Sequence, residues 1–262
     1  GTLEYPPEEG HAHRLVSRTI EALDGIESTE APYFLHLALL EAHPPYFASP
    51  PYDTLVRTDS VDLPAQGGSG RPEWQIMARE QMGTEKATEN DIVKMVAVYL
   101  GMLAYADAQM RRLCEEMGRR GLLENTWIII GSDHGDYAGE KGLFTKTESL
   151  YECLLHVPLI IVPPANIQWN RGGRVAGLVD HVDLFPTILT LAGAPVPAYA
   201  QGHDLVSWLR GGLREPLRDA VFAQVGEYHG SLGTTMPSGL PLAGRHPGLV
   251  QGVRTAAFSY VR

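Results

Sequence analysis

Residues 126–146 read TWIIIGSDHGDYAGEKGLFTK, an apolar run that gives way to a polar, glycine-containing stretch. The run over 126–132 is apolar and β-branched almost throughout, as is typical of a central strand covered on both faces. Asp133 and His134 follow it directly. Because a glycine-bearing turn begins at this point, we expect the carboxylate and the imidazole to point into one crevice at the C-terminal end of a buried strand.

Helical and strand patterns alternate on both sides of this stretch. Apolar residues at helical spacing predict helices over 11–27, 91–120, 148–155 and 182–192. Short apolar runs predict buried strands over 33–40, 126–132, 158–162 and 220–225. Proline and glycine clusters interrupt residues 48–90, where we expect a long excursion with at most a short helix. The alternation predicts an α/β fold with a mostly parallel sheet and helices on both faces.

The composition excludes several classes of protein. With 262 residues, 44% apolar and 20% charged, the chain is typical of a globular protein rather than a disordered or fibrous one. It contains no run of about 18 apolar residues, so we expect no membrane span. The formal net charge of -10 argues against nucleic acid as the main partner, because such binding needs clustered Lys and Arg.

Two observations bear on the cellular compartment. The first residues have neither the basic region nor the apolar region of a signal peptide. Cys114 and Cys153 lie in apolar or helical-looking segments, where a small buried thiol is commoner than a disulfide. We therefore expect a reducing compartment and a cytoplasmic location.

A carboxylate oxygen beside an imidazole nitrogen is a metal-ligating combination. Asp133 and His134 suit Mn, Zn or Fe better than Ca, which prefers shells made of oxygen alone. The alternative is that Asp133 caps the following turn and that His134 hydrogen-bonds to the backbone. These two residues alone leave both interpretations open.

Lys146 and His43 are the other candidates for chemistry. Lys146 lies 12 residues after His134, and a loop of that length can return the ammonium to the same crevice, where it would neutralise a transferring anion. His43 lies just past the predicted strand over 33–40 and could donate to an anion or a leaving group. A solvated surface lysine and a structural turn histidine are the alternatives. The shared position beyond strand ends favours one common site.

Several segments resemble sulfatases of the alkaline phosphatase-like superfamily, and they occur in the order of that family. The segments SDHGDYAGEKGLFTK, ESLYECLLHVPLIIVPP and VDHVDLFPTILTLAGAP resemble the downstream part of a sulfatase. FLHLALLEAHPPYFASP resembles the family's strand and His-Pro segment, and YLGMLAYADAQMRRL resembles its long helix. The resemblance covers most of residues 31–209. Asp-His at the metal position resembles the phosphonate monoester hydrolase and phosphodiesterase branch more than the arylsulfatases.

The resemblance implies a fold and a set of roles. The fold would be the three-layer αβα arrangement of the alkaline phosphatase-like superfamily. Asp133 and His134 would ligate a divalent metal, Mn or Ca, with Zn as a further alternative. Lys146 would contact the transferring sulfuryl or phosphoryl oxygens, and His43 the same group or the leaving oxygen. His181 and Asp183 resemble structural positions rather than catalytic ones.

The sequence also departs from the family pattern. The family's nucleophile is a Cys or Ser in C/S-x-P-x-R that becomes formylglycine, and no residue of this chain fits that motif. The acidic pair that completes the family's metal shell normally lies upstream. Asp136, Glu140 and Glu148 are spare acids nearby that the family does not use as ligands. We therefore expect an incomplete C-terminal portion of an active site, with formylglycine only in the missing N-terminal segment and little or no turnover alone.

The resemblance divides the chain into residues 1–225, a sulfatase-like domain lacking its N-terminal segment, and 226–262, the start of a C-terminal extension. The expected substrate is a small anionic ester of sulfate, phosphonate or phosphate. An apolar face left open where the upstream portion would pack predicts a homo-oligomer. Two alternatives stay open: a metal-dependent phosphatase or phosphomutase of the same superfamily, and a non-catalytic remnant that binds no metal.

Overall fold

A computed structural model describes residues 1–27, 31–68, 70–147, 149–168, 173–174, 176–210, 216–226 and 250–261. They divide into two compact units along one chain. The first unit comprises Gly1–Thr126 and Gly135–Thr147, and the second comprises Trp127–His134 and Glu148–Arg262. Within the described ranges, none of the helices combines the length and apolar character that a bilayer crossing needs.

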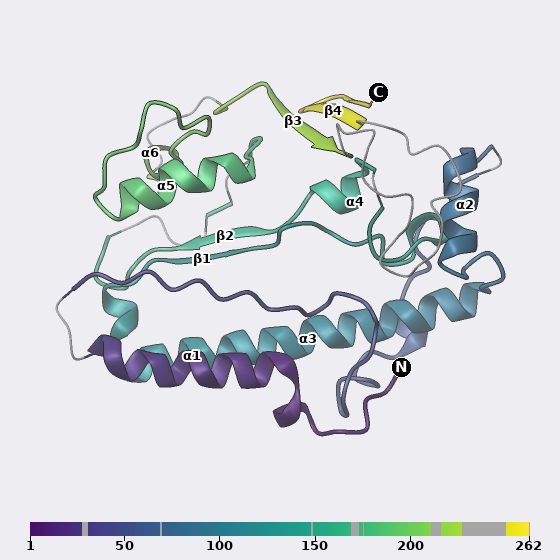
Figure 1. The fold of residues 1–262 in the computed structure, drawn as a ribbon, viewed down its shortest axis with the longest axis horizontal. Helices are drawn as coiled ribbons and strands as arrows, with labels where there is room; N and C mark the ends of the chain where they lie inside the picture. Colours follow the sequence, from purple (N-terminus) through teal and green to yellow (C-terminus); the bar gives the residue numbers. More distant parts are fainter. Residues whose placement is uncertain are drawn as a thin grey trace, which may run out of the picture. The chain divides into compact units, whose positions relative to one another are not determined.

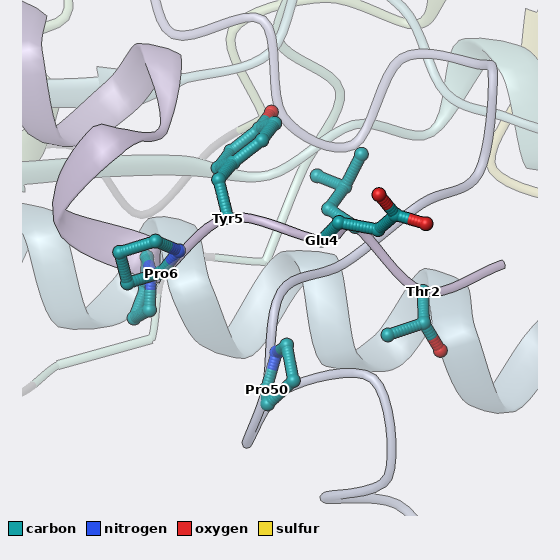
Figure 2. A pocket seen from close by; sticks show the side chains of 7 residues that line it. Thr2, Glu4, Tyr5, Pro6 and Pro50 are labelled. Carbon is teal, nitrogen blue, oxygen red and sulfur yellow. The ribbon is translucent and has the colours of Figure 1, made fainter.

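Two long helices, α1 (His11–Glu27) and α3 (Glu89–Arg119), pack side by side in the first unit (Figure 1). The contact is built by the apolar stripe of α1, because Ala12, Val16 and Leu23 are each 0% exposed. The helices predicted over 11–27 and 91–120 are therefore confirmed, with ends that differ by no more than two residues.

The ends of α3 follow from local chemistry. At its start, the Thr88 hydroxyl accepts a hydrogen bond from the backbone N–H of Asp91 at 3.2 Å and forms a capping box. At its end, Gly121 takes the left-handed conformation at φ 72°, which glycine adopts without steric cost. Short 3-10 turns, η1 (Pro7–Glu9) and η3 (Leu122–Glu124), flank the two long helices.

The stretch between α1 and α3 holds little regular structure. It contains η2 (Thr58–Ser60) and α2 (Glu73–Gln81), which confirms the predicted excursion with a short helix. The strand predicted over 33–40 is wrong: these residues form no strand, and Phe34 and Leu40 are 74% and 61% exposed. An apolar run becomes a strand only where another strand pairs with its backbone, and no described residue pairs with this one.

In the second unit, β1 (Ile128–Gly131) pairs with β2 (Leu159–Val162), and α4 (Glu152–Leu155) lies just before β2. Both strands confirm the predicted positions. Their pairing is antiparallel, as are the other sheet pairings between described strands, so the mostly parallel sheet is not confirmed. The helix predicted over 148–155 shrinks to the single turn of α4, too short for the crossover that parallel neighbours require.

The rest of the second unit follows the predictions closely. A 3-10 turn, η5 (His181–Asp183), leads into α5 (Leu184–Leu191), and together they match the helix predicted over 182–192. The strand β3 (Ala220–Val225) lies where it was predicted. The remaining elements are α6 (Val206–Leu209), β4 (Val250–Thr255) and β5 (Ser259–Val261), and the sheet order is β3-β4-β5. Most of the predicted extension, residues 227–249, lies outside the described residues, as does Glu148.

Candidate active site

Asp133 and His134 lie just beyond the end of β1, as predicted, and their side chains lie together. The imidazole Nε2 of His134 is 3.5 Å from the carboxylate Oδ2 of Asp133. The Asp133 side chain is 86% exposed and that of His134 is 31% exposed, so both are open to a ligand from solvent. The other carboxylate oxygen, Oδ1, accepts a hydrogen bond from the His134 backbone N–H at 3.0 Å. One carboxylate oxygen of Asp133 thus accepts the backbone hydrogen bond, while the other lies near the imidazole.

Hydrogen bonds within the second unit fix the turn that carries this pair. The Ser132 hydroxyl donates to the His134 carbonyl at 2.7 Å. The Ser132 carbonyl lies 2.9 Å from the imidazole Nε2 of His181, which therefore donates to it, because a carbonyl oxygen only accepts. His181 thus supports the turn, as its resemblance to a structural position implies.

The donor types at Asp133 and His134 fit a divalent metal, but they supply only part of a shell. Zn requires about four ligands, and Ca takes six to eight. Within the described residues, no group of three or more His, Cys, Asp or Glu side chains is arranged to hold a metal ion. The spare acids add none: Asp136 is engaged elsewhere, Glu140 belongs to η4 (Glu140–Gly142), and Glu148 lies outside the described residues.

Lys146 stands at the end of a tightly closed loop in the first unit. The Tyr137 N–H donates to the Thr145 carbonyl at 3.0 Å and joins the two stems of the loop. Tyr137, Leu143 and Phe144 are 1%, 0% and 3% exposed, so the loop is anchored by its own apolar side chains. Lys146 itself is exposed. The exposed Lys146 side chain therefore follows directly on a closed, anchored loop.

Gly139 allows this loop to close. Its φ is 93°, a value that residues other than glycine rarely adopt. A Cβ at this position would also clash, because it would lie 2.8 Å from the Cγ2 of Ile92. Thr145 also adopts a positive φ, 59°, directly before Lys146. Thr145 is β-branched, so this backbone conformation is strained and must be held by its surroundings.

Tyr46 provides such a hold, and it is not among the residues predicted from the sequence. Its hydroxyl donates to the Asp136 carboxylate at 2.8 Å and accepts from the Thr145 N–H at 2.6 Å. Burial, together with the neighbouring Asp136 carboxylate, raises the pKa of Tyr46 far above its ordinary value, so the hydroxyl keeps its proton. The signal that could have found it is its place at the end of the His43-Pro44-Pro45-Tyr46 sequence.

His43 lies on an exposed turn of the first unit. Its backbone N–H donates to the Leu40 carbonyl at 2.7 Å, and its ring Nδ1 lies 2.8 Å from the Pro44 carbonyl. A carbonyl oxygen only accepts, so Nδ1 carries a proton, and Nε2 donates only in the imidazolium form. Both the turn role and the donor role considered for His43 are therefore compatible with this geometry.

Asp183 is a structural residue of the second unit. Its side chain is 0% exposed and forms an ion pair with Arg218, which is 12% exposed. It also accepts hydrogen bonds from the backbone N–H groups of Asp180 at 2.8 Å and His203 at 2.7 Å. The carboxylate thus links η5 to two later segments of the chain.

The chain belongs to the sulfatase family, because the family model matches residues 2–194. It is 40% identical over 123 residues to arylsulfatase K of Bos taurus. The aligned region is 47% of this chain and 22% of that protein. It is 28% identical over 199 residues to the multifunctional alkaline phosphatase superfamily protein PehA of Trinickia caryophylli. The aligned region is 69% of this chain and 38% of that protein. The chain thus spans less than half the length of these relatives.

The fold is similar to that of the phosphonate monoester hydrolase of Agrobacterium radiobacter. The TM-score is 0.82 at 24% sequence identity, over 100% of this chain and 54% of that one. This likeness is one of fold, and it supports the predicted α/β class.

The expected cytoplasmic location is wrong. The arylsulfatase K relatives are sulfatases of the lysosomal or endoplasmic-reticulum type rather than cytoplasmic ones. The error came from weighing Cys114 and Cys153 as an indicator of compartment. Both thiols are half-buried, and a packed thiol behaves like an apolar side chain whatever the redox state outside.

Proposed function

We propose that this chain carries part of the active site of a hydrolase that cleaves esters of sulfuric, phosphonic or phosphoric acid. The observation that carries the proposal is the Asp133 and His134 pair at the end of β1, in a chain that the sulfatase family model matches over residues 2–194. The similarity to arylsulfatase K supports sulfur as the reacting centre, and the similarity to PehA supports phosphorus.

In this proposal each residue has a role set by its chemistry. Asp133 and His134 hold a divalent metal, Mn, Ca or Zn, together with ligands from outside these residues. When bound, the metal supplies positive charge to the transferring group. The Lys146 ammonium binds the anionic oxygens of that group. His43 donates a hydrogen bond from its ring to the same group or to the leaving oxygen.

The same proposal covers the substrate, the domains and the assembly. The substrate is a small anionic ester, and the family domain is residues 1–225, followed by the start of an extension over 226–262. Phe222, Phe258 and Tyr260 of the β3-β4-β5 region are 74%, 76% and 63% exposed. Such apolar exposure supports a homo-oligomer, because apolar side chains that gather on a surface favour association.

Residues 1–262 alone should show little or no turnover, because they hold no C/S-x-P-x-R nucleophile motif. The measurement is release of p-nitrophenol from its sulfate ester and from its phenylphosphonate ester, with Mn2+, Ca2+ or Zn2+ added. The Lys146→Ala variant of the same chain controls for contaminating hydrolases. Turnover that disappears in this variant would contradict the prediction.

Lys146→Ala should weaken the binding of inorganic sulfate by roughly tenfold or more, because a charge-assisted hydrogen bond contributes about 1.5–3 kcal/mol. The fold should be unaffected, since the side chain is exposed. Titration calorimetry of residues 1–262 with sodium sulfate measures the affinity. Lys86→Ala is the matched control, because it removes the same charge from a side chain that is 91% exposed. Equal sulfate affinities in the two variants would show that Lys146 does not contact the anion.

A further inference from the structure

The two candidate anion-contacting residues of the first unit are joined by a single side chain. Tyr46 lies three residues after His43, and its hydroxyl accepts a hydrogen bond from the N–H of Thr145, the residue before Lys146. The same hydroxyl donates to Asp136, on the opposite stem of the Lys146 loop. The chain distance is 90 residues or more for each contact, so the link is tertiary.

The ring of Tyr46 is held as firmly as its hydroxyl. It meets Phe144 at 5.7 Å between ring centroids and Tyr99 at 5.9 Å, both in edge contacts. Phe144 is 3% exposed and lies in the same hydrophobic cluster as Ile92 and Val96 of α3. The position of the hydroxyl is therefore fixed by packing against the long helix, before any ligand arrives.

Thr145 needs this support because its backbone is strained. A β-branched residue with φ 59° is strained relative to its relaxed conformation. Both of its backbone polar groups are engaged: the N–H by Tyr46 and the carbonyl by Tyr137. Without the Tyr46 hydroxyl, the strain favours a return of Thr145 to negative φ. This change would rotate the following residue, Lys146, away from its present direction.

We propose that Tyr46 is a positioning residue for the anion site: its hydroxyl, held between Asp136 and the Thr145 N–H, fixes the direction of Lys146 and ties the His43 turn to the same loop. The inference rests on the proposed function, which gives Lys146 and His43 their anion. It adds a residue that touches no substrate and acts through its neighbours.

The test is the Tyr46→Phe variant of residues 1–262, which keeps the ring and removes the hydroxyl. Amide hydrogen exchange of Thr145 should become about tenfold faster, because its hydrogen-bond partner is lost. The affinity for inorganic sulfate should fall about tenfold. In the Lys146→Ala background, Tyr46→Phe should change sulfate affinity by less than twofold, because the residue acts through Lys146.

Tyr105→Phe is the matched control for stability. The Tyr105 hydroxyl also donates one hydrogen bond, to the Pro7 carbonyl at 2.7 Å, and accepts one, from the His13 N–H at 3.2 Å. This substitution likewise removes a donated and an accepted contact in the same unit, on a different segment. Its unfolding midpoint in urea should fall as that of Tyr46→Phe does, while its sulfate affinity stays within twofold of the wild type.

Asp136 gives an independent arm if Tyr46→Phe folds poorly. Asp136→Asn keeps an oxygen that accepts from the Tyr46 hydroxyl and should retain sulfate affinity within threefold, whereas Asp136→Ala should lose about tenfold. Sulfate binding that is equal in wild type, Tyr46→Phe and Asp136→Ala would overturn the positioning role and leave the proposed function intact. A wild-type chain that binds no sulfate would overturn both.

Discussion

Replacing Asp133 with alanine should weaken the binding of Mn2+ to residues 1–262 by more than about a hundredfold. The carboxylate is one of two donors that the described residues place together, 3.5 Å apart, so its loss leaves the His134 imidazole alone. Replacing a residue that hydrogen-bonds to a metal ligand typically lowers metal affinity 10- to 100-fold. Removing a ligand itself should lower it at least as much. Calorimetric titration, repeated with Ca2+ and Zn2+, measures the change.

Asp59→Ala is the control for the Asp133 experiment. Its carboxylate is 62% exposed and engages Arg57, so the substitution removes the same charge from a different part of the surface. Metal affinity should be unchanged in this variant. Equal losses of metal affinity in Asp59→Ala and Asp133→Ala would mean that the cations respond only to the overall negative charge of the chain. A wild-type chain that binds none of the three cations would support the non-catalytic remnant instead.

Asp183→Ala should lower the free energy of unfolding by about 3–5 kcal/mol, because it leaves the largely buried Arg218 guanidinium without its anion. It also strips the N–H groups of Asp180 and His203 of their acceptor. Urea unfolding followed by circular dichroism measures the loss. The large effect reflects the 0% exposure of the carboxylate, since an ion pair in water contributes far less.

Two further variants separate burial from charge in this prediction. Glu152→Ala removes an acid that is 56% exposed and lies 3.4 Å from Arg254 in the same unit, so it should cost less than about 1 kcal/mol. The double substitution Asp183→Ala with Arg218→Met should recover part of the loss, because the uncompensated cation is then gone. A cost for Asp183→Ala no greater than that for Glu152→Ala would contradict the buried role.

The helices were predictable because their signal is local. The apolar stripe of α1 and the cap residues of α3 lie within a few residues of the elements that they define. The same holds for β3, whose predicted and observed ranges coincide at 220–225. These elements needed no knowledge of what packs against them.

Strand pairing was not predictable in the same way. The run over 33–40 has the composition of a buried strand, yet it forms none, because pairing depends on a second backbone that its own sequence does not specify. The antiparallel direction of β2 against β1 was not predictable for the same reason. The alternation of patterns indicates strands and helices, but it does not fix the relative direction of neighbouring strands.

The candidate site divides along the same line. Asp133 and His134 lie together because they are adjacent in sequence, whereas the return of the Lys146 loop to this pair stays a prediction. Tyr46 escaped because its contacts join residues 90 or more positions apart. A hydrogen bond of that kind leaves no periodic pattern, so only the folded chain reveals it.

The division of the chain into two units has a consequence for engineering. The second unit is entered at Trp127, left after His134, and resumed only after Thr147, so neither unit is one uninterrupted stretch. A chimera joined between His134 and Lys146 would take the carboxylate and imidazole from one parent and the lysine from the other. Exchange of modules between homologous proteins should therefore keep residues 127–147 as one inherited block.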